Sequence, residues 1–519
     1  MAGPAGISRQ GGILYALANL TVWIGACIGS QFHSGSLATV LYVGLLFTLC
    51  SVPLLLSRRL NDRHAILGIF MLGYFLYFGG ALDLSSLLLG SDVPPEPRDA
   101  SLNVAELAAI TGAAMVLCGY LLNINSGLRA APGRALREWP AVWVLVIGAL
   151  LWVLGTLTMM YYSLVVAPAK TTAATSQGLL MLGPLMTFLV MLAHLVQPLG
   201  LVMLAYGYAR YRGPMWLGLI VIVILTQIVY GFLADIKSQA IAGFALVIIV
   251  RSLVDNRMPK LWIACALAFL VVCFPIFQAY RAEITGERGL DRAQALQQIG
   301  KVLEIVLATS DKVNEGRDRA QTFLERASSK QVLELLFAHV GEDVEFLNGR
   351  SLVAIPMTFV PRLIAPDKEG LSVALLFDQK ILKQRGDNLT YISVTQLGEF
   401  YWNFGWPGIV VGMLFTGLLL GYLGGRFDLQ DGVTLTRVLL LLATAQTLCM
   451  GFGGSIEGSY VVWLRSIGAI GIMHWLFARA PLASSTQGSR ADPAPTVGTE
   501  RGVLSAAVAS GPRFPNLIR

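Results

Sequence analysis

The residues best suited to chemistry lie in the longest polar interval of the chain, residues 281–406. Within it, Arg362 follows Pro361, and Glu399 precedes an aromatic run that begins at Phe400. An arginine can hold two phosphate oxygens at once, and a carboxylate can take a proton from an attacking hydroxyl group. We therefore expect Arg362 to bind a donor diphosphate and Glu399 to act as a general base in transfer to a hydroxyl acceptor.

Further residues near the expected outer ends of apolar runs could bind the same substrates. Four of them are cations: Arg281, Lys237, Lys368 and Arg465. Arg465 lies inside an apolar run, where a charge usually faces a cavity or a partner, although a long side chain can also extend to the headgroups. Lys237 and Arg281 could instead be exposed basic residues at span ends. Lys368 could instead pair with a neighbouring acid. The rings of Tyr401 and Trp402 could stack on sugar faces, so we predict all six as substrate-binding residues.

No metal and no other cofactor is expected. The five histidines are scattered, and the six cysteines all lie in apolar runs, which also argues against a structural disulfide. The sequence contains no phosphate-binding glycine loop, no zinc-type spacing and no Gly-x-Ser-x-Gly motif. The cations must therefore neutralise a leaving diphosphate by themselves.

The composition places these residues in a membrane protein. Hydrophobic residues make up 55% of the 519 residues and charged residues only 13%, with a mean hydropathy of +0.65. Soluble domains carry about 25% charged residues. The net charge of +7 does not indicate nucleic-acid binding, because the basic residues lie mostly in short turns between apolar runs.

Twelve apolar runs are long enough for transmembrane helices, since a bilayer core requires about 20 residues. They cover residues 11–32, 36–56, 65–82, 104–123, 140–162, 178–208, 215–233, 238–254, 261–280, 407–425, 437–453 and 460–478. One set of connections holds fourteen Lys and Arg residues, and the alternate short connections hold three. Positive residues mark the cytoplasmic side, so we expect both termini in the cytoplasm and the long polar interval outside.

The expected architecture is an all-α polytopic membrane protein. Residues 1–280 would form a membrane domain with nine transmembrane helices, 281–406 a large periplasmic loop with amphipathic helices, and 407–480 a membrane domain with three more. The residues from 389 to 404 are expected to form a helix that leads into the tenth span. The tail, 481–519, is rich in Ala, Ser, Pro, Thr and Gly and is expected to be disordered.

Two short motifs and the order of the spans resemble a known family. The motifs are Phe359-Val-Pro-Arg362 with Pro366-Asp-Lys368, and Leu397-Gly-Glu399-Phe-Tyr401-Trp-Asn403-Phe-Gly405. They resemble those of bacterial oligosaccharide repeat-unit polymerases, the Wzy-type polymerases of O-antigen or exopolysaccharide. The topology resemblance covers most of the chain. Family members often carry a Gly-Ser-Arg-like signature in a turn near the middle spans, whereas this chain has Ala234-Asp-Ile-Lys237-Ser238.

The resemblance implies a reaction at the periplasmic face of the bacterial inner (cytoplasmic) membrane. A growing glycan on undecaprenyl diphosphate would be transferred to the non-reducing end of a new lipid-linked repeat unit. Undecaprenyl diphosphate would leave, and the fold would be that of a metal-independent, multispan glycosyltransferase. The implied partners are the undecaprenyl-diphosphate-linked oligosaccharide, the lipid bilayer, a chain-length regulator and a flippase.

Other functions stay open. A lipid-linked oligosaccharide flippase or another transporter would explain the spans, but it accounts less well for the long polar interval. An O-antigen ligase-like glycosyltransferase would use a histidine in that interval, where only His339 is present, in a context unlike that of ligases. A purely structural assembly subunit is a third alternative. Metal-dependent transferases are disfavoured because the first outer connection, residues 31–35, has no acid.

Overall fold

The computed structural model of the chain describes residues 9–32, 36–57, 62–89, 103–125, 138–162, 184–234, 237–269, 328–360, 364, 372–383, 392–429, 432–449, 451 and 454–478. Three of the predicted site residues, Arg281, Arg362 and Lys368, lie outside these ranges. The tail 481–519 and all of the residues that precede Ser328 in the long polar interval lie outside them as well.

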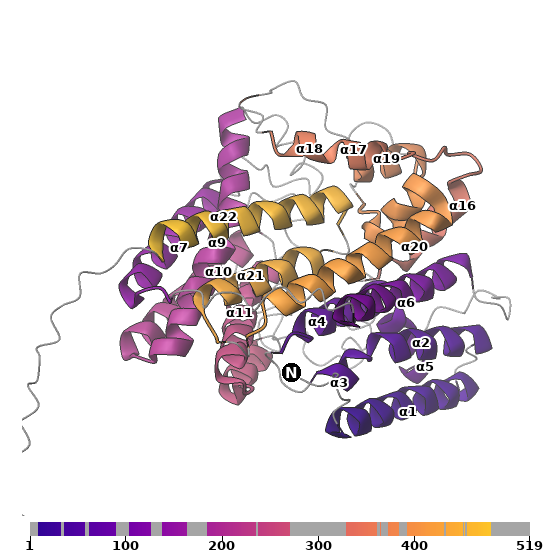
Figure 1. The fold of residues 1–519 in the computed structure, drawn as a ribbon, viewed down its shortest axis with the longest axis horizontal. Coiled ribbons are helices and arrows are strands. Elements are labelled where there is room, and N and C mark those ends of the chain that lie inside the picture. The colour runs from indigo at the N-terminus through magenta and orange to yellow at the C-terminus, as the bar shows by residue number, and fades with distance from the viewer. Residues whose placement is uncertain are drawn as a thin grey trace, which may run out of the picture. The chain divides into compact units, whose positions relative to one another are not determined.

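Every regular element in the described part of the chain is a helix (Figure 1). The N-terminal half forms α1 (Arg9–Phe32), α2 (Leu37–Cys50), α3 (Pro53–Leu56), α4 (Ala65–Tyr77), α5 (Gly80–Leu89), α6 (Val104–Asn125), α7 (Ala141–Tyr161), α9 (Pro184–Tyr211), α10 (Pro214–Ala234) and α11 (Lys237–Asp255). The C-terminal half forms α16 (Lys330–His339), α17 (Arg350–Val353), α18 (Ile355–Thr358), α19 (Val373–Lys380), α20 (Thr395–Arg426), α21 (Leu435–Thr444), the π-helices η3 (Ala445–Cys449) and η5 (Glu457–Val461), and α22 (Val462–Phe477).

The described helices confirm a helical, multi-pass membrane protein. Eight of them are long and apolar enough to cross a bilayer, or up to nine if the bent pair α4–α5 is one span. The expected span at 261–280 is described only as far as Phe269, and the one at 437–453 forms the shorter apolar helix Leu435–Cys449. The count of twelve spans therefore stays a prediction.

The expected single span at 65–82 is broken. α4 and α5 meet at a bend of 58°, and Gly79 between them has a φ of +83°, a conformation that side chains disfavour. The carbonyl of Tyr77, freed by the break, accepts a hydrogen bond from the Ser329 backbone N–H at 2.7 Å. The break therefore gives an attachment point to the described residues 328–383, which we call the outer segment after their predicted side of the membrane.

Close helix packing depends on glycine where α20 lies along α6 (Figure 1). A Cβ atom at Gly119 of α6 would clash with the Leu414 carbonyl, and one at Gly417 of α20 would clash with the Val116 carbonyl. Small residues allow helix backbones to approach closely within a membrane. This pairing fixes the span that follows the outer segment.

The outer segment shares its core with the spans. Leu333 and Leu336 of α16 and Phe377 of α19 are buried in the same apolar cluster as Tyr74 of α4 and Met413 of α20. Residues Met1–Arg479 form one compact unit. The described part of residues 281–406 is therefore packed on the membrane domain, within the same unit.

Candidate functional site

The candidate site begins with a sharp break inside α20. Gly405 has a φ of +63° and a ψ of −149°, and Pro407 follows it. The Phe400 ring lies against Gly412, although twelve residues of straight helix would span about 18 Å. The helical residues 395–404 therefore fold back on the span that begins after Gly405. A helix over residues 389–404 was predicted to lead into this span, and the described helix begins at Thr395.

Asn403 joins the end of this first half to the outer segment. The backbone N–H groups of Leu347 and Asn348 donate to the carbonyls of Trp402 (2.9 Å) and Asn403 (3.2 Å), which the helix break would otherwise leave unpaired. The Asn403 amide donates to Ser351 Oγ at 2.8 Å and accepts from the Gly349 N–H at 3.0 Å. The fully buried Asn403 side chain is therefore a structural connection.

Glu399 lies on the same half-helix and is completely buried. Its Oε2 accepts a hydrogen bond from the backbone N–H of Ile456 at 2.6 Å, directly before η5 and α22. Its Oε1 is buried and accepts no bond of ordinary geometry from the residues that the structure describes, although Ser351 lies beside the carboxyl group. Glu399 thus stands where the outer segment, α20 and the last span meet.

Arg465 of α22 holds the outer segment a few residues before Arg362. Its guanidinium donates to the carbonyl of Thr358, at the end of α18, and lies over the ring of Phe359, 5.9 Å from the centroid. The side chain is partly buried. Arg465 therefore positions the segment that continues to Arg362.

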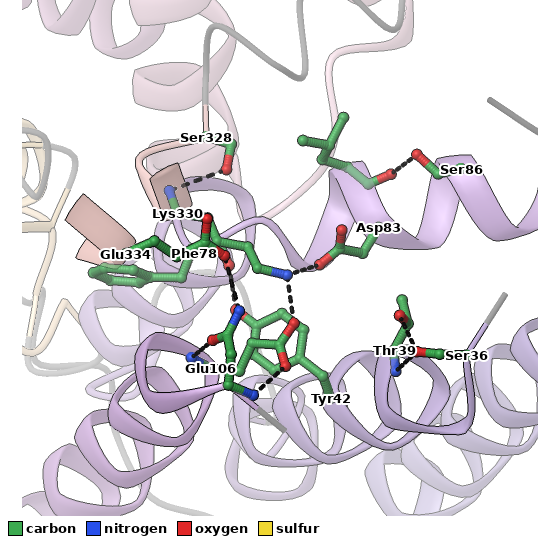
Figure 2. A network of polar contacts seen from close by, with 12 residues as sticks. Ser36, Thr39, Tyr42, Phe78, Asp83, Ser86, Glu106, Ser328, Lys330 and Glu334 are labelled. Atoms are coloured by element: carbon green, nitrogen blue, oxygen red, sulfur yellow. Dashed lines mark hydrogen bonds and ion pairs between the residues drawn. The ribbon is translucent and has the colours of Figure 1, made fainter. Parts of the chain in front are cut away.

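A buried ion cluster holds α16 on the spans (Figure 2). The ammonium of Lys330 donates to Asp83 Oδ2 of α5 at 2.8 Å and to Glu106 Oε1 of α6 at 2.5 Å. It also lies 4.7 Å from the centroid of the Tyr42 ring. The side chains of Lys330, Asp83 and Glu106 are only 7%, 11% and 4% exposed. We refer to these three residues as the Lys330 cluster.

A second set of bonds orients the Lys330 cluster. Asn103 caps α6, because its side chain accepts from the Glu106 N–H at 2.8 Å while Glu106 Oε2 accepts from the Asn103 N–H at 3.1 Å. The Asn103 amide also donates to Glu334 of α16 at 2.9 Å. Each charged group therefore has a partner of opposite charge and a fixed direction, as Figure 2 shows.

Both aromatic residues predicted to stack on sugars are packed in the core in this structure, and their role in binding stays a prediction. Trp402 is 0% exposed and its indole N–H donates to the Glu345 carbonyl at 3.2 Å, so neither face of the ring is open to a sugar. Tyr401 packs on Phe337 at a centroid distance of 4.0 Å. Both rings belong to the core beneath the outer segment, since apolar burial outweighs exposure for rings of this size.

Of the predicted cations, the structure describes Arg465 and the position of Lys237 only. Lys237 is the first residue of α11. The side chain of Arg465 contacts the outer segment, but neither an ion pair nor a direct hydrogen bond joins it to Glu399 among the contacts described above. The joint action of Arg362 and Glu399 therefore stays a prediction.

Sequence reasoning missed the Lys330 cluster and Asn403. Lys330 lies 224 residues from Glu106 and 247 from Asp83, so no local pattern connects them. One signal was present: Glu106 lies within the apolar run 104–123, and a buried acid requires a partner. Within the described ranges, no group of three or more His, Cys, Asp or Glu residues is arranged to hold a metal ion.

Chemically, the arrangement offers a carboxyl group at a junction of three elements and an arginine that holds the adjoining segment. Such a group can exchange a proton with a bound hydroxyl. Comparison of the chain with known protein families, with curated proteins and with solved structures gives no match. The functional interpretation therefore depends on the residues and their geometry.

Proposed function

We propose that this chain is an oligosaccharide repeat-unit polymerase, a metal-independent glycosyltransferase that makes O-antigen or exopolysaccharide. The observation that carries the proposal is the placement of Glu399. It is fully buried on a folded-back half-helix, with one oxygen bonded to the backbone before the last span. Ionisable groups buried in membrane proteins generally have a functional role, and a carboxyl group here suits proton transfer from a sugar hydroxyl.

In the proposed reaction, an acceptor hydroxyl oxygen attacks the anomeric carbon of the donor glycan. The bond between that carbon and the diphosphate oxygen breaks, and undecaprenyl diphosphate leaves with the bonding electrons. Glu399 takes the proton of the hydroxyl group. Arg362 holds the diphosphate, and Arg281, Lys237 and Lys368 add positive charge to the same region.

Because Glu399 is covered, the acceptor must reach it through a movement of the covering residues. Ser351 and Ile456 contact the Glu399 carboxyl group, so the segments that carry them form the cover. Arg465 links the first of these segments to α22. Arg465 therefore serves the reaction chiefly as a positioning residue for the Arg362 segment.

The membrane arrangement in this proposal has twelve transmembrane helices, both termini in the cytoplasm, and residues 281–406 in the periplasm. One set of connections holds fourteen basic residues and the alternate short connections hold three, and this bias supports the arrangement. In this arrangement the flippase supplies lipid-linked units to the outer leaflet, and a chain-length regulator acts on the growing polymer.

Removal of this chain from its source bacterium tests the proposal. We expect long polymer to disappear and single undecaprenyl-diphosphate-linked units to accumulate on the outer leaflet, where an added glycosidase cleaves them. Expression of the wild-type chain should restore polymer, and Arg362→Lys, which keeps charge without the two-point grip, should not. Units that remain on the inner leaflet would instead indicate a flippase, and persistent polymer would exclude a polymerase.

A further inference from the structure

Among the described residues, buried polar atoms without partners are concentrated just before and within the half-helix that carries Glu399. Four of them lie in seven residues: Ser393 Oγ, both amide atoms of Gln396, and Glu399 Oε1. None has a hydrogen-bond partner of ordinary geometry among the residues that the structure describes. Gln396 is 1% exposed. Burying an unpaired amide opposes folding, so beside Glu399 its presence suggests a partner other than the described residues.

Helix geometry places Gln396 on the same side as Glu399. Residues three and seven apart share one helix face, so Gln396, Glu399 and Asn403 form one polar stripe. The other sides of this half-helix are occupied: Leu397 lies against Gly112 of α6, and Gly398 against Leu333 of α16. Gln396 is therefore directed toward the side where Glu399 contacts Ile456 and Ser351.

The backbone at the start of this stripe is strained. Thr395 has a φ of +64°, which is costly for a residue with a Cβ atom, and such strain is typically found at functional sites. The hydroxyl of Thr395 accepts from the Gly398 N–H at 3.1 Å, which holds the first turn in place. Gln396 lies within this first turn.

The chemistry of Gln396 selects for hydroxyl groups. An amide offers two donors and an acceptor, and a sugar hydroxyl needs both kinds of partner. A phosphate would require cations, and the stretch from Ser393 to Glu399 contains none. We infer that Gln396 binds a hydroxyl of the acceptor sugar beside the hydroxyl that Glu399 deprotonates. This inference rests on the proposed function and extends it to the recognition of the acceptor.

The test compares two buried glutamines. Gln396→Met removes the amide at nearly constant volume. Gln227→Met is the matched control, because Gln227 of α10 is also 1% exposed with both amide atoms unpaired within the described structure. The probe is the soluble oligosaccharide that mild acid releases from the undecaprenyl-linked repeat unit. Its binding is measured as the rise in unfolding temperature of the detergent-purified full chain.

We expect neither substitution to lower the unfolding temperature without ligand, since each removes an unpaired buried amide. Gln396→Met should need about tenfold more oligosaccharide for the same shift, and the control should match the wild type. In membranes, Gln396→Met should also shorten the polymer. Gln396→Asn keeps the amide on a side chain that is one methylene shorter, so it should weaken binding as well.

The inference fails if Gln396→Met binds the oligosaccharide as the control does, because the amide then holds only buried water. It also fails if Gln396→Met unfolds, because the amide then has a structural partner. These outcomes differ from failure of the proposed function, in which the wild-type chain itself makes no polymer from lipid-linked units.

Discussion

Two buried polar regions join the outer segment to the spans, and they differ in how their groups are paired. In the Lys330 cluster, one ammonium lies between two carboxylates, and an asparagine cap orients one of them. In the stretch from Ser393 to Glu399, four polar atoms have no bond of ordinary geometry within the described residues. A paired cluster stabilises a structure, whereas buried polar groups without partners require a further explanation, such as a catalytic role or a bound group.

The difference also predicts opposite consequences of substitution. Removal of one member of the Lys330 cluster leaves a buried charge without its partner, so folding should suffer. Removal of a group from the unpaired stretch should affect the reaction and leave folding intact or improved, as in other trade-offs between stability and activity. Two of the four substitutions below separate these effects directly, and the other two test contacts outside both regions.

Glu399→Gln should have the largest effect. The amide keeps the shape and an acceptor for the Ile456 N–H, but it cannot take a proton, and loss of a general base typically slows a reaction about 10²–10⁴-fold. The rate of polymerisation is measured as polymer formed per minute in membrane vesicles, and immunoblotting shows whether protein levels are normal. Glu342→Gln, in an exposed turn of the outer segment, is the control. A normal rate for Glu399→Gln would remove this residue from the chemistry.

Lys330→Met should destabilise the chain by about 3–5 kcal/mol, because Asp83 and Glu106 then stay buried without their cation. This loss of stability is checked by comparing the unfolding temperature in detergent and the resistance to proteolysis of the variant with those of the wild type. Lys383→Met, at a 73% exposed side chain 3.9 Å from Asp343, should change little. Neutralising the acids as well, through Asp83→Asn and Glu106→Gln, should recover part of the loss. No loss of stability in Lys330→Met would mean that the two regions do not differ as described.

Arg465→Lys should reduce polymerisation about tenfold, which corresponds to the loss of one hydrogen bond to a charged group. Lysine keeps the charge but loses the planar contact with Phe359 and the directed bond to Thr358. Protease cleavage after α18 should become faster in this variant because the segment is held less firmly. Equal cleavage with a reduced rate would instead indicate that Arg465 binds substrate.

His339→Ala should have the smallest effect. The His339 ring pairs with Asp343 at 2.9 Å in an exposed turn, and this hydrogen bond lowers the pKa of the Asp343 carboxyl. The contact is local, so polymerisation should stay within about twofold of the wild-type rate, as for other exposed pairs. Complete loss of transfer would favour a ligase-like reaction that uses this histidine.

The fold was largely predictable because long apolar runs leave a chain few alternatives in a membrane. The break in α20 also had a local signal, since Gly405 precedes Trp406 and Pro407. The bend at Gly79 was not predicted, and the Lys330 cluster had only the signal of Glu106 inside an apolar run, because its members come from distant parts of the chain. The catalytic role of Glu399 stays a prediction from its motif. The burial of Trp402 was not predicted, because an aromatic run can pack in a core as readily as it can bind a sugar.

The measurement closest to the central claim uses purified chain in liposomes with undecaprenyl-diphosphate-linked repeat units in the outer leaflet. We expect polymers of two or more units to form and one undecaprenyl diphosphate to be released for each bond made, at the same rate with and without EDTA. Glu399→Gln should release almost none. Transfer of intact units across the bilayer without bond formation, or a rate that EDTA abolishes and Mg²⁺ restores, would contradict the assignment of this chain as a metal-independent polymerase.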